Sequence, residues 1–220
     1  MLNQALSFSG LKTNYRIICY GFLLATAFAW ISGCATPARQ EGSEAIVKTI
    51  VIEPVGNAQS APAADFNLLG RISIQSRNQN FSGSFRWRHL AIGDEILLFT
   101  SLGQTIAEIA RDHNGFRLIT AKLEAFYAND AESLTEEILG WRLPLNGLQY
   151  WIQGIHSPVT VAEKDLNNKN QVIAMRQDGW VIQYLSYMPT QPNVPAFPRV
   201  LSLNYEDLKL RLVIDNWNTE

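Results

Sequence analysis

The residues that most often do chemistry in proteins are few in this chain and lie far apart. Its 220 residues include only three histidines, and no two of them have the i, i+4 spacing of a helical zinc site. Each lies in or beside a predicted turn. We therefore predict no metal site and interpret all three as surface or turn residues: His89, His113 and His156.

The sequence also lacks the motifs of the common enzyme classes. It contains no Gly-x-Ser-x-Gly elbow, glycine-rich phosphate loop or dinucleotide fingerprint. Carboxylate pairs occur, but we expect Asp94-Glu95 in a solvated turn and Glu136-Glu137 on an exposed helix face. We predict no catalytic residue and no cofactor other than covalently attached lipid, for which the next feature argues.

One cysteine has surroundings that predict a chemical modification. Residues 1–16 hold two bases and no acid, and an apolar stretch follows over residues 17–30. That stretch is shorter than the ~20 residues of a membrane-spanning helix and is typical of a secretory signal. It ends at Ile31-Ser32-Gly33-Cys34, which resembles a bacterial lipobox. The alternative is a chance Gly-Cys pair at the end of a membrane anchor.

The lipobox resemblance implies cleavage before Cys34, a diacylglycerol on its sulfur and an acyl chain on its new amine. The chain would then consist of a signal peptide (1–33), a lipidated stalk (34–64) and one folded domain (65–220). Each buried CH₂ contributes ~0.8 kcal/mol, so several acyl chains would hold the protein at the membrane. In enterobacterial sorting an Asp after the lipidated cysteine favours inner-membrane retention. Ala35 therefore implies the outer membrane, on its periplasmic face.

Composition favours a single folded domain. With 17% charged and 47% hydrophobic residues the chain is not of the disordered class, and a formal charge of -2 gives no electrostatic basis for nucleic-acid binding. No repeat of 20–50 residues occurs. Within the expected stalk only residues 46–52 have strand composition, as an edge strand or as a docked piece of linker.

From Asp65 onward, polar and apolar side chains alternate with a period of two. Residues 68–74 and 81–87 show it most clearly, and the polar segment 77–80 between them predicts a hairpin. We expect a mainly β fold, an open antiparallel barrel or half-barrel of about ten or eleven strands. The further strands are expected at residues 95–100, 105–110, 116–120, 123–127, 172–176, 180–188, 200–205 and 208–214.

Two short helices are expected between the strands. Asp130 is a cap residue for a helix over 130–139 that ends at Gly140, and Asn146 is expected to cap a second helix over 147–153. Their apolar sides suit a lid or plug across an open barrel mouth. The expected lid residues are Leu134, Ile138, Leu148, Trp151 and Ile152.

Several strands are apolar on both faces, which has two explanations. In the first, helices cover a fully packed sheet; in the second, the concave face lines a cavity for long apolar ligands. Alternation alone selects the candidate cavity lining: Phe85, Trp87, Leu98, Phe116, Leu118, Trp180 and Tyr184.

A predicted strand connection contains one large apolar residue, Leu102, between Ser101 and Gly103. A single surface leucine usually packs against a neighbour. On a protein tethered to a bilayer it could instead insert into the lipid, and burial of one leucine side chain there contributes ~1.5–3 kcal/mol. We name Ser101, Leu102 and Gly103 as the candidate membrane-insertion loop.

Several strings resemble the LolB family of outer-membrane lipoprotein receptors. The resemblance spans about residues 66–217, and residues 140–154 are its most specific part. The matching strings are Leu69-Gly70-Arg71, residues 81–87, Thr100-Ser101-Leu102-Gly103, residues 130–134, residues 140–154 and Asp215-Asn216-Trp217.

The LolB resemblance implies an open β-barrel with a helical lid over an apolar cavity that holds lipoprotein acyl chains. It implies that the protein, as a monomer, receives triacylated lipoproteins from the periplasmic carrier LolA and delivers them to the inner leaflet of the outer membrane. It also implies a membrane-targeting role for Leu102. The family pattern has a proline where this chain has Ser101, and a helix where it has the stalk.

The sequence contains no nucleotide-binding motif, which agrees with a passive transfer of acyl chains from the carrier to this protein. Pulling an acyl chain of about 15 CH₂ groups into water would cost ~12 kcal/mol, whereas transfer between apolar sites needs only small affinity differences. Three other classes remain as alternatives: a lipoprotein that binds another lipid, a structural scaffold of an envelope complex, and a hydrolase, for which no nucleophile–base pair is visible.

Overall fold

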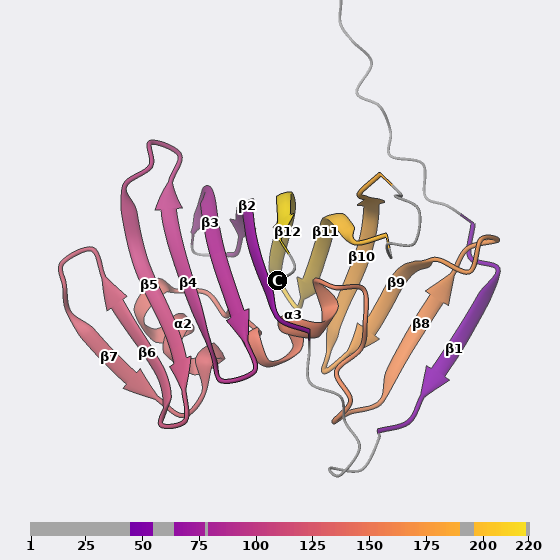
Figure 1. Ribbon diagram of the computed structural model, residues 1–220, viewed down its shortest axis with the longest axis horizontal. Helices are drawn as coiled ribbons and strands as arrows, with labels where there is room; N and C mark the ends of the chain where they lie inside the picture. The colour runs from indigo at the N-terminus through magenta and orange to yellow at the C-terminus, as the bar shows by residue number, and fades with distance from the viewer. Residues whose placement is uncertain (1–44, 55–63, 78, 190–195, 219–220) are drawn as a thin grey trace, which may run out of the picture. The chain divides into compact units, whose positions relative to one another are not determined.

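The computed structural model describes residues 45–54, 64–77, 79–189 and 196–218. Cys34 and the expected signal peptide lie outside the described residues, as does most of the expected stalk. Twelve strands form one antiparallel sheet (Figure 1). They are β1 (Lys48–Ile52), β2 (Phe66–Gln75), β3 (Asn80–Leu90), β4 (Gly93–Thr100), β5 (Thr105–Asp112), β6 (Gly115–Thr120), β7 (Ala125–Ala128), β8 (Ala162–Leu166), β9 (Val172–Gln177), β10 (Trp180–Tyr187), β11 (Pro198–Tyr205) and β12 (Leu208–Asn218).

The sheet is open. Its strand order is β1-β8-β9-β10-β11-β12-β2-β3-β4-β5-β6-β7, so β1 and β7 stand at its two ends and do not pair with each other. The longest strands, β2, β3 and β12, lie side by side in the middle. They join two wings of consecutive hairpins, β4–β7 and β8–β11, and β1 pairs with β8 at the outer edge of the second wing. The prediction of a mainly β, open antiparallel fold is confirmed.

The strand count exceeds the expected ten or eleven for two reasons. Residues 48–52 form edge strand β1, paired with β8 from Lys48↔Leu166 to Ile52↔Ala162, which decides between the two interpretations of that segment. Strand β8 itself was not predicted, because its sequence Ala-Glu-Lys-Asp-Leu is polar. Its Asp165 is buried nonetheless, since it accepts hydrogen bonds from Thr49 and Arg176 on the neighbouring strands.

Two helices complete the described fold: α2 (Ala131–Leu139) and α3 (Leu145–Trp151). The limits of α2 are as predicted, because the Asp130 side chain accepts a hydrogen bond from the Ser133 amide and Gly140 ends the helix at φ 81°. The predicted cap of α3 is wrong. The helix begins two residues earlier, with Pro144 at its N-cap position and Asn146 inside the first turn. Proline suits a helix start because its missing N–H has no partner there.

The predicted alternation of polar and apolar side chains identifies the side of the strands that faces the core. Leu68, Ile72 and Ile74 of β2 are buried, while the intervening Leu69 and Arg71 are exposed. The inward side chains of β2 to β7 and β9 to β12 form a single hydrophobic cluster with those of both helices. In Figure 1, α2 is drawn behind β4–β6 and α3 near the middle of the sheet.

Candidate functional site

The seven predicted lining residues share the inner face of the sheet. Strand pairing explains this: Phe85 of β3 is opposite Leu98 of β4, and Leu118 of β6 is opposite Ile109 of β5. All seven are buried members of the same hydrophobic cluster: Phe85, Trp87, Leu98, Phe116, Leu118, Trp180 and Tyr184.

The helices cover this face. Four of the five expected lid residues are buried in the same cluster as the lining residues, and the fifth, Ile138, packs against it partly buried. The Trp151 and Trp180 ring centroids lie 6.2 Å apart, which places α3 directly over β10. The lining side chains therefore pack against the helical segment in this arrangement. The buried four are Leu134, Leu148, Trp151 and Ile152.

Two side chains of the sheet hold the end of α3. The Tyr184 hydroxyl donates to the Trp151 carbonyl at 2.9 Å, and the Trp151 indole donates to Gln177 Oε1 at 2.8 Å. Gln177 also accepts from the Ser157 amide and donates to the Ser157 carbonyl, so it fixes the chain that follows the helix. Burial raises the pKa of Tyr184 well above its ordinary value, which keeps the hydroxyl protonated as a donor.

Sequence reasoning missed Gln177, although one signal could have indicated it. Gln177 shares the inward phase of β9 with the buried Met175, and both are opposite inward residues of β10. A polar residue in an inward position must find hydrogen-bond partners, and α3 with its following loop supplies them.

Contacts at the β2–β3 hairpin hold α2. The Gln79 side-chain amide donates to the Leu139 carbonyl at the end of the helix. Trp141, directly after the helix, stacks on Phe81 with centroids 6.3 Å apart. The buried Thr135 hydroxyl accepts a hydrogen bond from the Leu143 amide at 2.9 Å and so fixes the connection to α3.

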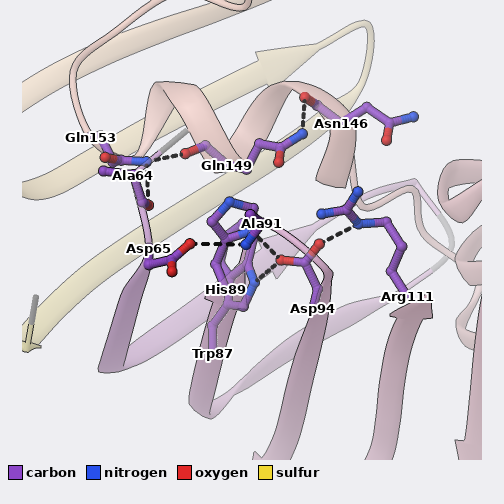
Figure 2. Close-up of polar contacts among 10 residues, drawn as sticks. All are labelled: Ala64, Asp65, Trp87, His89, Ala91, Asp94, Arg111, Asn146, Gln149 and Gln153. Atoms are coloured by element: carbon purple, nitrogen blue, oxygen red, sulfur yellow. Dashed lines mark hydrogen bonds and ion pairs between the residues drawn. The ribbon is translucent and has the colours of Figure 1, made fainter. Parts of the chain in front are cut away.

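A buried polar cluster lies at the β3–β4 hairpin (Figure 2). Asp94 Oδ1 accepts hydrogen bonds from the Trp87 indole at 2.8 Å and pairs with His89 Nδ1 at 2.7 Å, and Oδ2 pairs with Arg111. Burial alone would raise the pKa of Asp94. The hydrogen bonds from His89 and Trp87, with the charges of His89 and Arg111, outweigh burial and hold the pKa below its usual value.

This cluster corrects two predictions. His89 is buried in β3 rather than at the surface, and Asp94 is buried rather than in a solvated turn. Both Asp94 oxygens are engaged by donors, so the arrangement suits a structural tie between β3, β4 and β5. Nearby, the Asp65 carboxylate accepts from the Ala91 amide, and Gln153 reaches the Ala64 carbonyl at 3.5 Å (Figure 2).

The other two histidines differ from each other. His113 is exposed in the β5–β6 turn, as predicted. His156 is half-buried, and its Nδ1 has no hydrogen-bond partner among the described residues. Burial, and secondarily the charge of Lys164, lowers the pKa of His156. In the described ranges no three His, Cys, Asp or Glu side chains are grouped so that they could hold a metal ion.

The candidate membrane loop is the turn that joins the end of β4 to the start of β5. Leu102 is 86% exposed, and the neighbouring Ser101 and Gly103 are exposed as well. The Thr100 hydroxyl accepts hydrogen bonds from the Leu102 and Gln104 amides, which shapes the turn. Of the helices within the described part of the chain, none is long and apolar enough to cross a membrane.

Comparison with known proteins identifies the family. The family model described as "Outer membrane lipoprotein LolB" matches residues 64–217, which include β2 to β11 and all of β12 except its last residue. The chain belongs to the LolB family. The outer-membrane lipoprotein LolB of Nitrosomonas europaea is 44% identical over 188 residues, covering 86% of this chain and 87% of that protein. LolB of Thiobacillus denitrificans is 34% identical and covers 88% of this chain and 95% of that one.

Among solved structures, a LolA superfamily protein from Nitrosomonas europaea matches with a TM-score of 0.47 at 10% identity, covering 73% of this chain and 88% of that one. Membership of the LolB family identifies the chain as an outer-membrane lipoprotein. The concave face and its two helices lie within the matched residues, and β1 lies outside them.

Proposed function

We propose that this protein receives acylated lipoproteins from a LolA-like periplasmic carrier and inserts them into the inner leaflet of the outer membrane. The cargo's acyl chains lie against the concave face while the protein stays anchored through a triacylated Cys34. The observation that supports this most is the continuous apolar face of an open sheet, which among the described residues is covered by the segment that holds the two short helices. We propose no catalytic step, because handover breaks no covalent bond.

Acceptance of a chain requires a helix to shift, and the contacts of α3 make that feasible. The polar contacts that tie Trp151 to the sheet come from Tyr184 and Gln177, and a hydrogen bond contributes only ~0.5–1.5 kcal/mol net. The buried apolar side chains of this helical segment pack in the hydrophobic cluster, and an acyl chain entering the same space would replace their contacts with equivalent burial. The free-energy change of replacing the helix contacts with acyl-chain contacts is therefore close to zero, and the exchange needs no nucleotide hydrolysis.

Delivery follows from differences in affinity. Transfer of about 15 CH₂ groups through water would cost ~12 kcal/mol, so the chain must pass from cavity to cavity and then directly into lipid. The affinity of the acceptor for the acyl chain must be higher than that of the carrier and lower than that of the bilayer. A lipid anchor keeps the acceptor next to its final destination, which favours delivery over return.

Photo-crosslinking on edge strand β7 tests this route with a matched pair of positions. Phe126 packs partly buried against the core, whereas the next residue, Tyr127, is 73% exposed on the other face. Benzoylphenylalanine replaces either residue in the full-length, lipid-processed protein held in vesicles. A LolA carrier loaded with a labelled triacylated lipoprotein is then added.

We expect the label to move to the vesicles and to crosslink at position 126 but not at 127. Vesicles without the protein provide the control for spontaneous transfer. If a carrier known to be active keeps its label, the proposed function is wrong. If the label moves without crosslinking at 126, the concave face is not the route. Crosslinking of free phospholipid, with no transfer from the carrier, would instead favour a lipoprotein that binds another lipid.

A further inference from the structure

Two neighbouring hairpin tips of the sheet have the same turn. In Thr100–Gln104, between β4 and β5, the Thr100 amide donates to the carbonyl of residue 104 and the Thr100 carbonyl accepts from the amide of residue 103. In Thr120–Glu124, between β6 and β7, the Thr120 amide donates to the carbonyl of residue 124 and its carbonyl accepts from the amide of residue 123. In both turns the threonine hydroxyl also accepts from the amide two residues later.

The fourth position of this turn is left-handed in both tips. Gly103 occupies it in the first tip with φ 81°, as expected for a turn that closes with a glycine bulge. Leu123 occupies it in the second tip with φ 64°. A leucine is disfavoured there, because its Cβ crowds the backbone in the left-handed region. Residues 123–127 were predicted as a strand, which is wrong at this end: β7 begins at Ala125.

The Leu123 side chain gains no burial in return for this conformation. It is 85% exposed, almost the same as Leu102 at 86%. Packing among the described residues therefore does not compensate for the left-handed conformation of this exposed leucine, and such a conformation is a reason to look for a function of the side chain.

The two leucines lie at the same end of the sheet. Strand β5 starts at the first tip and pairs with β6, which ends at the second, and the Ala121 amide donates to the Ile106 carbonyl at 2.9 Å. In Figure 1 both tips, and the first residues of β1, are on the upper side of the view, whereas the β3–β4 turn is on the lower side.

We propose that Leu123 is a second membrane-contacting residue, which enters the bilayer together with Leu102. The occupant is lipid rather than protein for two reasons. First, the 14 residues from Cys34 to Lys48 span at most about 50 Å, so an anchored domain stays within reach of the bilayer. Second, the flanking Lys122 and Glu124 cancel in charge, and the tip at Leu102 carries none, so the shared feature is apolar. The role in delivery rests on the proposed function, whereas the membrane contact needs only the lipid anchor at Cys34 and no transfer of lipoproteins.

Fluorescence quenching by lipid tests the contact directly. Cysteine is introduced at position 123, 102 or 92 of the full-length, lipid-processed protein in vesicles and labelled with an environment-sensitive fluorophore. Ile92 is the matched control, because it is 85% exposed and apolar but belongs to the turn at the opposite end of β4. Unsubstituted protein controls for labelling elsewhere. Brominated phospholipids then report which labels lie in the bilayer.

We expect quenching at 123 and 102 to be at least about three-fold stronger than at 92, because an interfacial side chain lies ~5–10 Å into the lipid. Leu123→Asp should reduce the quenching of the label at 102 by a similar factor, and Ile92→Asp should leave it unchanged. Leu123→Gly, which removes the side chain and suits the left-handed turn, should also reduce quenching at 102 without lowering the melting temperature, so a folding defect is distinguished.

Quenching at 102 but not at 123 would overturn the inference. A fluorescence change at 123 that needs the carrier and not the lipid would also overturn it, in favour of a protein partner. If 123 is quenched but no lipoprotein is ever transferred, the proposed function is wrong and the membrane contact remains.

Discussion

At the scale of single residues, Asp94 shows how a charge is tolerated in an apolar interior. Its two oxygens contact an indole, an imidazole and a guanidinium, which come from three positions on β3 and β5. A carboxylate buried this deeply is stable only with such partners, and removal of one partner of a buried pair costs ~3–5 kcal/mol. The cluster therefore ties β3, β4 and β5 together beside the β3–β4 turn.

We expect Asp94→Asn to lower the free energy of unfolding by about 3 kcal/mol at neutral pH, as measured by urea denaturation. Because the folded-state pKa of Asp94 lies below its unfolded value, its stabilisation is present above the ordinary aspartate range and is lost as the pH falls through that range and below. The wild-type protein should thus lose stability on acidification, and the variant should lose distinctly less. Equal pH profiles for the two proteins would contradict this account. Glu95→Gln, on the exposed face of β4, provides the control.

His89 and Asp94 were misassigned from the sequence because both adjoin a predicted turn. The alternation nevertheless contained the correct signal. His89 continues the odd-numbered inward phase of Phe85 and Trp87, and Asp94 continues the even-numbered phase of Ile96 and Leu98. Nearness to a turn is thus a weaker indicator of exposure than the phase of the strand.

At the scale of elements, α3 is held by packing and by a few polar contacts from β9 and β10. We expect Tyr184→Phe to remove the hydrogen bond to the Trp151 carbonyl while it keeps the aromatic packing. Loss of ~0.5–1.5 kcal/mol should raise amide hydrogen exchange across α3 by up to about ten-fold, with little change in β10. Mass spectrometry of exchanged peptides measures this.

Tyr187→Phe is the matched control for this prediction. The Tyr187 hydroxyl also donates to a carbonyl, but that of Val172 in β9, so its loss should leave α3 exchange unchanged. Equal effects of the two substitutions would mean that α3 is not independently held by Tyr184. Faster acceptance of cargo by the Tyr184→Phe protein would connect the looser helix to the proposed function.

The elements that were predicted well have local signals, and those that were missed depend on distant partners. Helix α2 carries its own start signal in Asp130 and its own stop signal in Gly140. Strand β8 is polar in sequence, and it is a strand because β1 and β9 pair with it on both sides. The start of α3 was misplaced because asparagine is the commoner cap, whereas Pro144 begins the helix without a side-chain hydrogen bond.

At the scale of the whole folded domain, the alternation of the strands predicted which face is apolar but not what covers it. A packed interior and a ligand cavity need the same inward side chains, so sequence could not distinguish them. In the structure the segment from Ala131 to Ile152 covers part of the inner face of the open sheet, and its tryptophans Trp141 and Trp151 are buried in the common cluster. The same residues can belong to a closed core and to a lipid-binding face if this segment moves as a unit.

Fluorine NMR of fluorotryptophan-labelled protein in nanodiscs tests that movement. When a loaded carrier supplies a triacylated lipopeptide, we expect the Trp141 and Trp151 resonances to shift and broaden, because their helical segment leaves the sheet. Trp87, fixed on β3 by its hydrogen bond to Asp94, should change little. Single Trp→Phe variants assign the signals, and an empty carrier is the control. A scaffold with a permanently filled interior would show no change at any tryptophan, whereas equal change at all of them would indicate a general loosening of the domain rather than a moving lid.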